Sequence, residues 1–178
     1  MYLYKIRCFY EKSGVARFIS NRNLQKLIER GLRRFGAPLK FTEGFSPHPK
    51  MSFGPPLPVN VSGTNEYFDF YATEKLDSNI FIETINNFLP EGICIKEAFL
   101  IPDGSVPMKH SDIFALYEII HDGVENDILR GWGEIVESGS TKTIIRVKVN
   151  NFSHKAMISM FLEGRIKDIK REITLQKH

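Results

Sequence analysis

The residues best suited to chemistry lie in the first third of the chain, in a helical pattern and in the loop that follows it. Five cations recur in the helical segment at spacings of three and four residues, with one adjacent pair: Arg22, Lys26, Arg30, Arg33 and Arg34. On a helix they form one basic stripe. Such a stripe suits the phosphates of a nucleic acid, because each Lys or Arg contact releases condensed counterions. The alternative is an ordinary solvated helix face, partly neutralised by Glu29.

The loop at residues 41–58 combines aromatic, basic and conformationally restricted residues, and it holds five of the nine prolines. Its stacking and charged groups, with the residue before it, are Lys40, Phe41, Phe45, His48, Lys50 and Phe53. A rigid, exposed loop of this kind can stack RNA bases while its cations hold phosphates. In the alternative interpretation, the phenylalanines are buried in the core and the prolines only lower the entropy of the unfolded chain.

His48 lies between Pro47 and Pro49 and can exchange a proton near neutral pH. A metal-independent ribonuclease needs such a group near the ribose 2′-hydroxyl. The sequence places no carboxylate or second histidine beside it, so His48 is a weak candidate for a catalytic residue.

A second aromatic segment, residues 66–71, alternates polar and apolar side chains. On a strand, Tyr67, Asp69 and Tyr71 share one face while Phe68 and Phe70 share the other. The polar face either presents its aromatic rings to bases or is itself buried.

Charge is distributed unevenly along the chain, whose overall net charge is +3. Residues 1–60 carry eleven Lys/Arg against three Glu, a net charge of +8, whereas the remainder has a net charge of −5. An anionic partner would therefore meet a polarised molecule.

Several function classes are disfavoured by what the sequence lacks. It has no Gly-rich phosphate loop, nucleophile elbow or zinc-finger spacing. Its two cysteines, Cys8 and Cys94, lie in apolar alternating runs and are expected to be buried free thiols, so we expect no metal and no cofactor. No apolar run reaches the roughly twenty residues of a membrane helix, and we find no signal peptide, so we expect no membrane contact and a cytoplasmic location.

Hydrophobic periodicity predicts the elements that position these residues. Residues 2–10 alternate as a half-buried strand, and Ser20 caps a helix that ends at Gly36. The remaining predictions for the first half are strands at 57–61 and 66–73, a helix at 78–89 and a strand at 92–101. For the second half they are a strand at 112–121, a helix at 124–132, strands at 133–137 and 142–150, a helix at 153–163 and a strand at 166–176.

The order β-α-β-β-α-β therefore occurs twice. This pattern predicts an α+β fold of two tandem ferredoxin-like units, with domains at residues 1–102 and 111–178.

Five segments of the first half carry a family resemblance: Arg17–Ser20, Glu29–Leu39, Thr42–Lys50, Ser52–Leu57 and Glu66–Asp69. Together they resemble the radical-SAM-linked family, a bacterial domain of unknown function whose members are fused to, or encoded beside, radical SAM proteins. The resemblance implies a radical SAM partner. This chain lacks the three-cysteine cluster motif of such an enzyme, so the cluster would reside in another polypeptide. Where the family usually has histidine and aspartate, this chain has Asn21 and Asn23, which weakens the case for chemistry performed here.

Together these features predict an accessory protein of a radical SAM system that binds RNA, rather than a self-contained enzyme. The residues expected to bind are the five helix cations with Lys40, Phe45, His48 and Lys50. Two alternatives remain open. One is a protein-only adaptor whose Pro-rich loop docks on the radical SAM enzyme, and the other is a metal-independent RNA-processing enzyme that uses His48.

Overall fold

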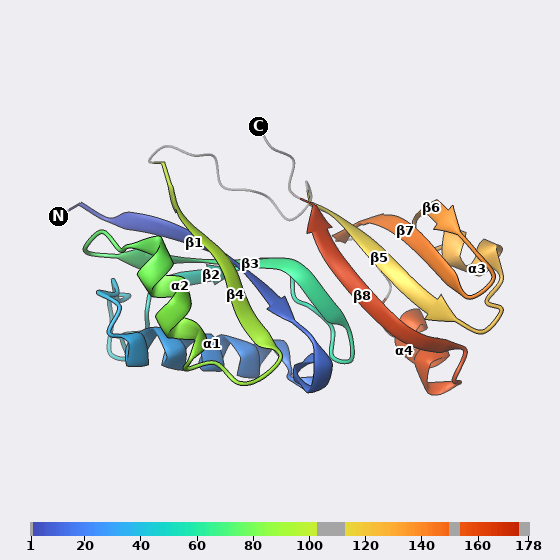
Figure 1. Cartoon of the computed structure of the whole chain (residues 1–178), viewed down its shortest axis with the longest axis horizontal. Coiled ribbons are helices and arrows are strands. Elements are labelled where there is room, and N and C mark those ends of the chain that lie inside the picture. The colour runs from blue at the N-terminus through green and yellow to red at the C-terminus, as the bar shows by residue number, and fades with distance from the viewer. Residues whose placement is uncertain (1, 103–112, 150–153, 175–178) are drawn as a thin grey trace. The chain divides into compact units, whose positions relative to one another are not determined.

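A computed structural model describes residues 2–102, 113–149 and 154–174 (Figure 1). The chain divides into two compact units, residues 1–59 with 66–107 and residues 60–65 with 108–178. The expected junction between domains, residues 103–110, lies outside the described residues.

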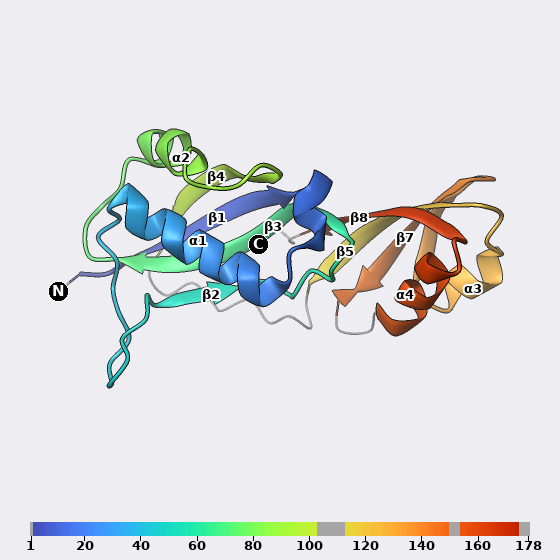
Figure 2. The ribbon, with the colours of Figure 1, turned by 90° about the horizontal axis from the view of Figure 1, so that it is seen from below.

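In the first unit, two helices cover one face of the strands (Figures 1 and 2). The elements are β1 (Tyr4–Lys12), the short 3-10 helix η1 (Gly14–Phe18), α1 (Asn21–Phe35), β2 (Met51–Phe53), β3 (Ser62–Ala72), α2 (Ser78–Asn86) and β4 (Ile93–Ile101). β1 lies between β4 and β3, and β2 pairs with the other edge of β3. The β1–β4 and β2–β3 pairs are antiparallel.

The second unit is built on an antiparallel group of strands. Its elements are β5 (Phe114–His121), α3 (Asn126–Arg130), β6 (Glu134–Ser138), β7 (Lys142–Lys148), α4 (His154–Leu162) and β8 (Ile166–Thr174). The strands follow the order β8-β5-β7-β6. The first residues of β3, Ser62–Thr64, belong to this unit and pair in parallel with β8 at Lys170–Glu172.

The prediction of two tandem ferredoxin-like units is therefore wrong. The eight strands form one mixed sheet in the order β4-β1-β3-β8-β5-β7-β6, with β2 on β3. The parallel β3–β8 pair arises because β3 begins at Ser62, earlier than the strand expected at 66–73. Gly63 and Asn65 have low strand propensity, so the residue pattern does not predict that β3 starts at Ser62.

The strand expected at 57–61 is also wrong, because β2 lies at Met51–Phe53 instead. Pro56 precedes the expected strand and Pro58 lies within it, and neither can donate a backbone hydrogen bond to a sheet. The run Met51–Phe53 contains no proline and pairs with Phe68–Phe70 of β3.

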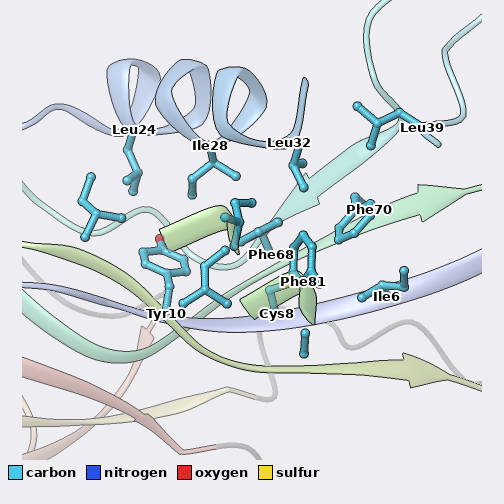
Figure 3. Close-up of a cluster of buried hydrophobic side chains, with 14 of the residues drawn as sticks. Ile6, Cys8, Tyr10, Leu24, Ile28, Leu32, Leu39, Phe68, Phe70 and Phe81 are labelled. Carbon is cyan, nitrogen blue, oxygen red and sulfur yellow. The ribbon is translucent and has the colours of Figure 1, made fainter. Parts of the chain in front are cut away.

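The core of the first unit explains why α1 forms and where it packs. The Ser20 hydroxyl accepts a hydrogen bond from the Asn23 N–H, and Gly36 ends the helix at a φ of 77°. Leu24, Ile28 and Leu32 follow at four-residue spacing and are fully buried. Figure 3 shows them directed at the strands, where their partners include Ile6, Cys8, Tyr10, Phe68 and Phe70. The predicted N-cap, C-cap and apolar face of this helix are confirmed.

Within the described ranges, every helix is too short or too polar to cross a lipid bilayer.

Candidate nucleic-acid interface

The basic stripe lies on the solvent side of α1. All five of its members are exposed, opposite the buried side chains of the helix: Arg22, Lys26, Arg30, Arg33 and Arg34. Arg33 forms an ion pair with Glu29, with 2.9 Å between Nη2 and Oε1. Among the residues whose structure is described, the other four form no ion pair with a carboxylate. We call Arg22, Lys26, Arg30 and Arg34 the free cations of α1.

Helix stability does not account for this arrangement. Like charges four residues apart destabilise a helix by about 0.2–0.5 kcal/mol, and the free cations contain three such steps. Arg22 also lies in the first turn, where the helix dipole disfavours positive charge and α1 has no acidic residue. Only Arg33 and Arg34, in the last turn, are favourably placed with respect to the dipole. The charge pattern of α1 is thus not one that stabilises the helix.

The loop after α1 forms a narrow arm, which we define as residues 41–50. Phe41 and Pro49 form an isolated antiparallel bridge. The Thr42 N–H donates to the His48 carbonyl over 2.8 Å, and the His48 N–H donates to the Thr42 hydroxyl oxygen over 3.1 Å. Figure 2 shows the arm projecting from the helices and strands of its unit. These hydrogen bonds hold a tip, residues 43–47, away from the core.

Only one of the three phenylalanines expected to stack on bases is presented to solvent. Phe45, at the tip of the arm, is fully exposed. Phe41 and Phe53 are partly buried and pack against the core, as the alternative interpretation of the loop expected. The arm therefore offers a single aromatic ring for stacking.

The base of the arm is attached to the last turn of α1. The Arg33 guanidinium lies 5.0 Å from the centre of the Phe41 ring, a cation–π contact. The Lys50 ammonium lies 4.5 Å from the centre of the Tyr71 ring, and the Lys40 N–H donates to the Tyr71 carbonyl. The structure thus places Lys40 and Lys50 at the base of the arm, near the C-terminal end of α1, with His48 farther along the arm and Phe45 at its tip, while Arg22 lies at the other end of the helix.

A second exposed aromatic ring lies at the N-terminal end of α1. Phe18 is 55% exposed and lies two residues before the cap Ser20. The Arg17 guanidinium lies 5.0 Å from its ring centre. Sequence analysis missed Phe18 because a single phenylalanine beside a helix start looks like a hydrophobic contact. The feature of the sequence that could have identified Phe18 is its position two residues before the polar cap Ser20.

The His48 side chain is exposed. No carboxylate or imidazole in the described part of the chain forms a hydrogen bond with its ring. A general acid or base is normally held by a second group, so the geometry adds no support to catalysis by His48. Asn21 is partly buried and Asn23 is exposed, both in the first turn of α1.

A second polar cluster lies on the strand face away from α1, and its charged side chains pair with one another. Arg7 binds Asp69 through two hydrogen bonds, Nε to Oδ1 over 2.7 Å and Nη2 to Oδ2 over 2.9 Å. Lys5 Nζ lies 3.1 Å from Asp69 Oδ2, and the Tyr67 ring packs under Arg7 at 4.7 Å. Tyr67 is only 5% exposed, so the face expected to present aromatic rings is buried at this point. Alternation in β1 and β3 could have placed Arg7 opposite Asp69 from sequence, because opposite charges favour neighbouring strand positions.

Burial and the Asp69 carboxylate shift the pKa values around this cluster. Burial raises the pKa of the Cys8 thiol well above its usual value, and the negative charge of Asp69 acts in the same direction. Burial lowers the pKa of Arg7, but the hydrogen bond and charge of Asp69 outweigh it and the net pKa is raised. Both groups therefore keep their protons, and the two hydrogen bonds between Arg7 and Asp69 hold this part of the strand face together.

Comparison with known proteins places the chain in one family. A family model described as an uncharacterized protein conserved in bacteria matches residues 5–176. No curated protein matches the chain at a significant level.

Proposed function

The chain belongs to this bacterial family, DUF2344, and from that premise we propose that it is an accessory protein that binds single-stranded RNA. The binding surface consists of the free cations of α1 together with the arm. The proposed partner is a radical SAM enzyme in the cytoplasm, an inference that rests on the motif resemblance of residues 17–70.

The observation that carries this proposal is the fully exposed Phe45 on an arm attached to a helix with four free cations. A phenylalanine buried in a core contributes about 1.5–3 kcal/mol, and Phe45 contributes none of this to the fold. Stacking of a base on an aromatic ring is worth about 1–3 kcal/mol, and exposed cations beside it can hold the phosphates. The exposed ring of Phe45 and the free cations of α1 therefore match the two requirements of single-strand binding.

The salt dependence of RNA affinity tests the role of the free cations. In the variant Lys26→Gln, Arg30→Gln and Arg34→Gln, we expect weaker binding of a labelled oligouridylate of about ten nucleotides. Each phosphate contact contributes about −0.7 to the slope of log K against log salt for single strands, so the slope should flatten by about 2. Fluorescence anisotropy at several salt concentrations measures both quantities.

A matched control removes the same charge elsewhere. The variant Lys75→Gln, Lys155→Gln and Lys170→Gln replaces three exposed lysines outside the proposed surface. It should leave the salt slope within error of the unmodified protein. Equal losses in both triple variants would show that net charge, rather than this surface, governs binding.

The same surface would also suit a protein-only adaptor, and one experiment separates the two functions. Phe45→Ala and the three-cation variant should both weaken RNA binding, if RNA is the ligand. If the unmodified protein binds no RNA but co-purifies with a radical SAM enzyme, and Phe45→Ala abolishes that co-purification, the arm is a protein-docking site. RNA cleavage that is lost in His48→Ala would instead support the enzyme alternative.

A further inference from the structure

The second unit contains a groove that the proposed RNA surface does not use. It has a volume of about 690 Å³ and is lined by residues of β5, β6, β7 and the end of β8 together with Trp132 and Gly133. All of the lining residues belong to the second unit. This volume lies within the range of about 300–1,000 Å³ typical of small-molecule sites.

Strand alternation explains why apolar side chains line this groove. Ala115, Tyr117 and Ile119 of β5 are fully buried in the core of the unit. Phe114 and Leu116 alternate with them and therefore project from the opposite face, where they line the groove. On β7, Lys148 and Arg146 are the cross-strand partners of Phe114 and Leu116 and lie on the same face. In the groove, apolar side chains of β5 therefore lie beside basic side chains of β7.

The two cations of the groove differ in whether a carboxylate neutralises them. Arg146 donates from Nε and Nη2 to Glu134 Oε2, over 3.1 and 2.6 Å. Lys148 forms no ion pair with any carboxylate in the described ranges, and its ammonium lies 5.7 Å from the centre of the Phe114 ring. One cation beside an aromatic ring therefore remains available to an anionic ligand.

We propose that this groove binds a small aromatic molecule with one acidic group. Its flat ring system would pack between Phe114, Leu116 and Trp132, where offset aromatic contacts are favourable. Its carboxylate, sulfonate or phosphate would pair with Lys148, because the Glu134 carboxylate already neutralises Arg146. The Val136 side chain, 56% exposed, forms part of the apolar wall.

The position of Trp132 makes the proposal directly measurable, because it is the only tryptophan of the protein. The probe is 8-anilinonaphthalene-1-sulfonate, an aromatic monoanion that accepts excitation energy from tryptophan. We expect saturable quenching of Trp132 fluorescence with one probe per chain. Absence of saturable quenching in the folded protein would overturn the proposal.

Two variants and a neutral probe test the role of charge. Lys148→Ala should weaken binding about tenfold, because it removes a charge-assisted contact. Val136→Glu, at an exposed position that tolerates a polar side chain, should abolish binding by adding a negative charge. Lys155→Ala, at an exposed position of α4 outside the groove, should leave binding unchanged. The uncharged N-phenyl-1-naphthylamine should bind more weakly to the unmodified protein and equally to Lys148→Ala.

Equal affinities for the anionic and neutral probes, or equal losses in Lys148→Ala and Lys155→Ala, would overturn the assignment of Lys148. Thermal unfolding of each variant confirms that the second unit remains folded. The proposal is independent of RNA binding, since no groove residue belongs to α1 or the arm.

Discussion

At the residue scale, the contrast between Arg33 and the free cations of α1 determines which substitutions are informative. Arg33 pairs with Glu29 and contacts Phe41, so its removal alters the attachment of the arm as well as the charge. Lys26, Arg30 and Arg34 form no such contacts with described residues. Changes in RNA affinity after their substitution therefore report charge alone.

The two cysteines should differ in reactivity. Cys8 is fully buried, whereas Cys94 is half-buried, so the expectation of a buried thiol is confirmed for Cys8. Burial raises the pKa of the Cys8 thiol, which keeps it protonated, and only the thiolate attacks a disulfide reagent. In a Cys94→Ser variant, we expect Ellman's reagent to label Cys8 only as fast as the protein unfolds.

Denaturant provides the comparison for that measurement, since unfolded Cys8 should be labelled rapidly. Native labelling as rapid as labelling in denaturant would contradict the burial of Cys8. The sign of the pH effect follows from the raised pKa. The contribution of Cys8 to stability is complete below the pKa of the unfolded thiol, and it is lost as pH rises from there toward the folded pKa.

At the element scale, one face of α1 packs in the core and the other carries the cations that we propose bind RNA. Ile28 is fully buried among core side chains, whereas Arg30 is exposed on the same helix. We expect Ile28→Ala to lower the free energy of unfolding by about 2–5 kcal/mol, because it leaves a cavity. Arg30→Ala should change it by less than about 0.5 kcal/mol while weakening RNA binding.

Urea unfolding and RNA anisotropy on both variants provide the test. An Arg30→Ala variant that loses as much stability as Ile28→Ala would show that the basic stripe has a structural role. In that case weak RNA binding would follow from unfolding rather than from lost phosphate contacts.

At the scale of the whole surface, the exposed rings of Phe18 and Phe45 predict a minimum RNA length. Phe18 and Phe45 lie beyond opposite ends of α1, whose fifteen residues span about 22 Å at 1.5 Å per residue. We expect affinity for oligouridylates to rise with length until one strand reaches both rings, within the footprint of about 4–16 nucleotides seen for single-strand binders.

Phe18→Ala and Phe45→Ala should then each cost about 1–3 kcal/mol for long strands, and only one of them should affect a strand too short to reach both rings. Isothermal titration of a length series measures this difference. Equal effects of both substitutions at every length would contradict a single strand that spans α1.

Local interactions made part of this molecule predictable. The Ser20 cap, the Gly36 end and the four-residue spacing of Leu24, Ile28 and Leu32 all act within a turn or two of helix. The sequence therefore predicted the bounds of α1 and both of its faces. The same holds for β1, whose alternation correctly separates Lys5 and Arg7 from the core.

The sequence by itself determined α1, its basic and apolar faces, and the concentration of positive charge before residue 60. Only the tertiary structure decided that β3 begins at Ser62 and pairs with β8, that β2 lies at Met51–Phe53, and that Arg33 contacts Phe41. It also brought Phe114, Trp132 and Lys148 together in one groove. These contacts join residues far apart in the chain, and strand pairing depends on the partner's register and edge rather than on local propensity.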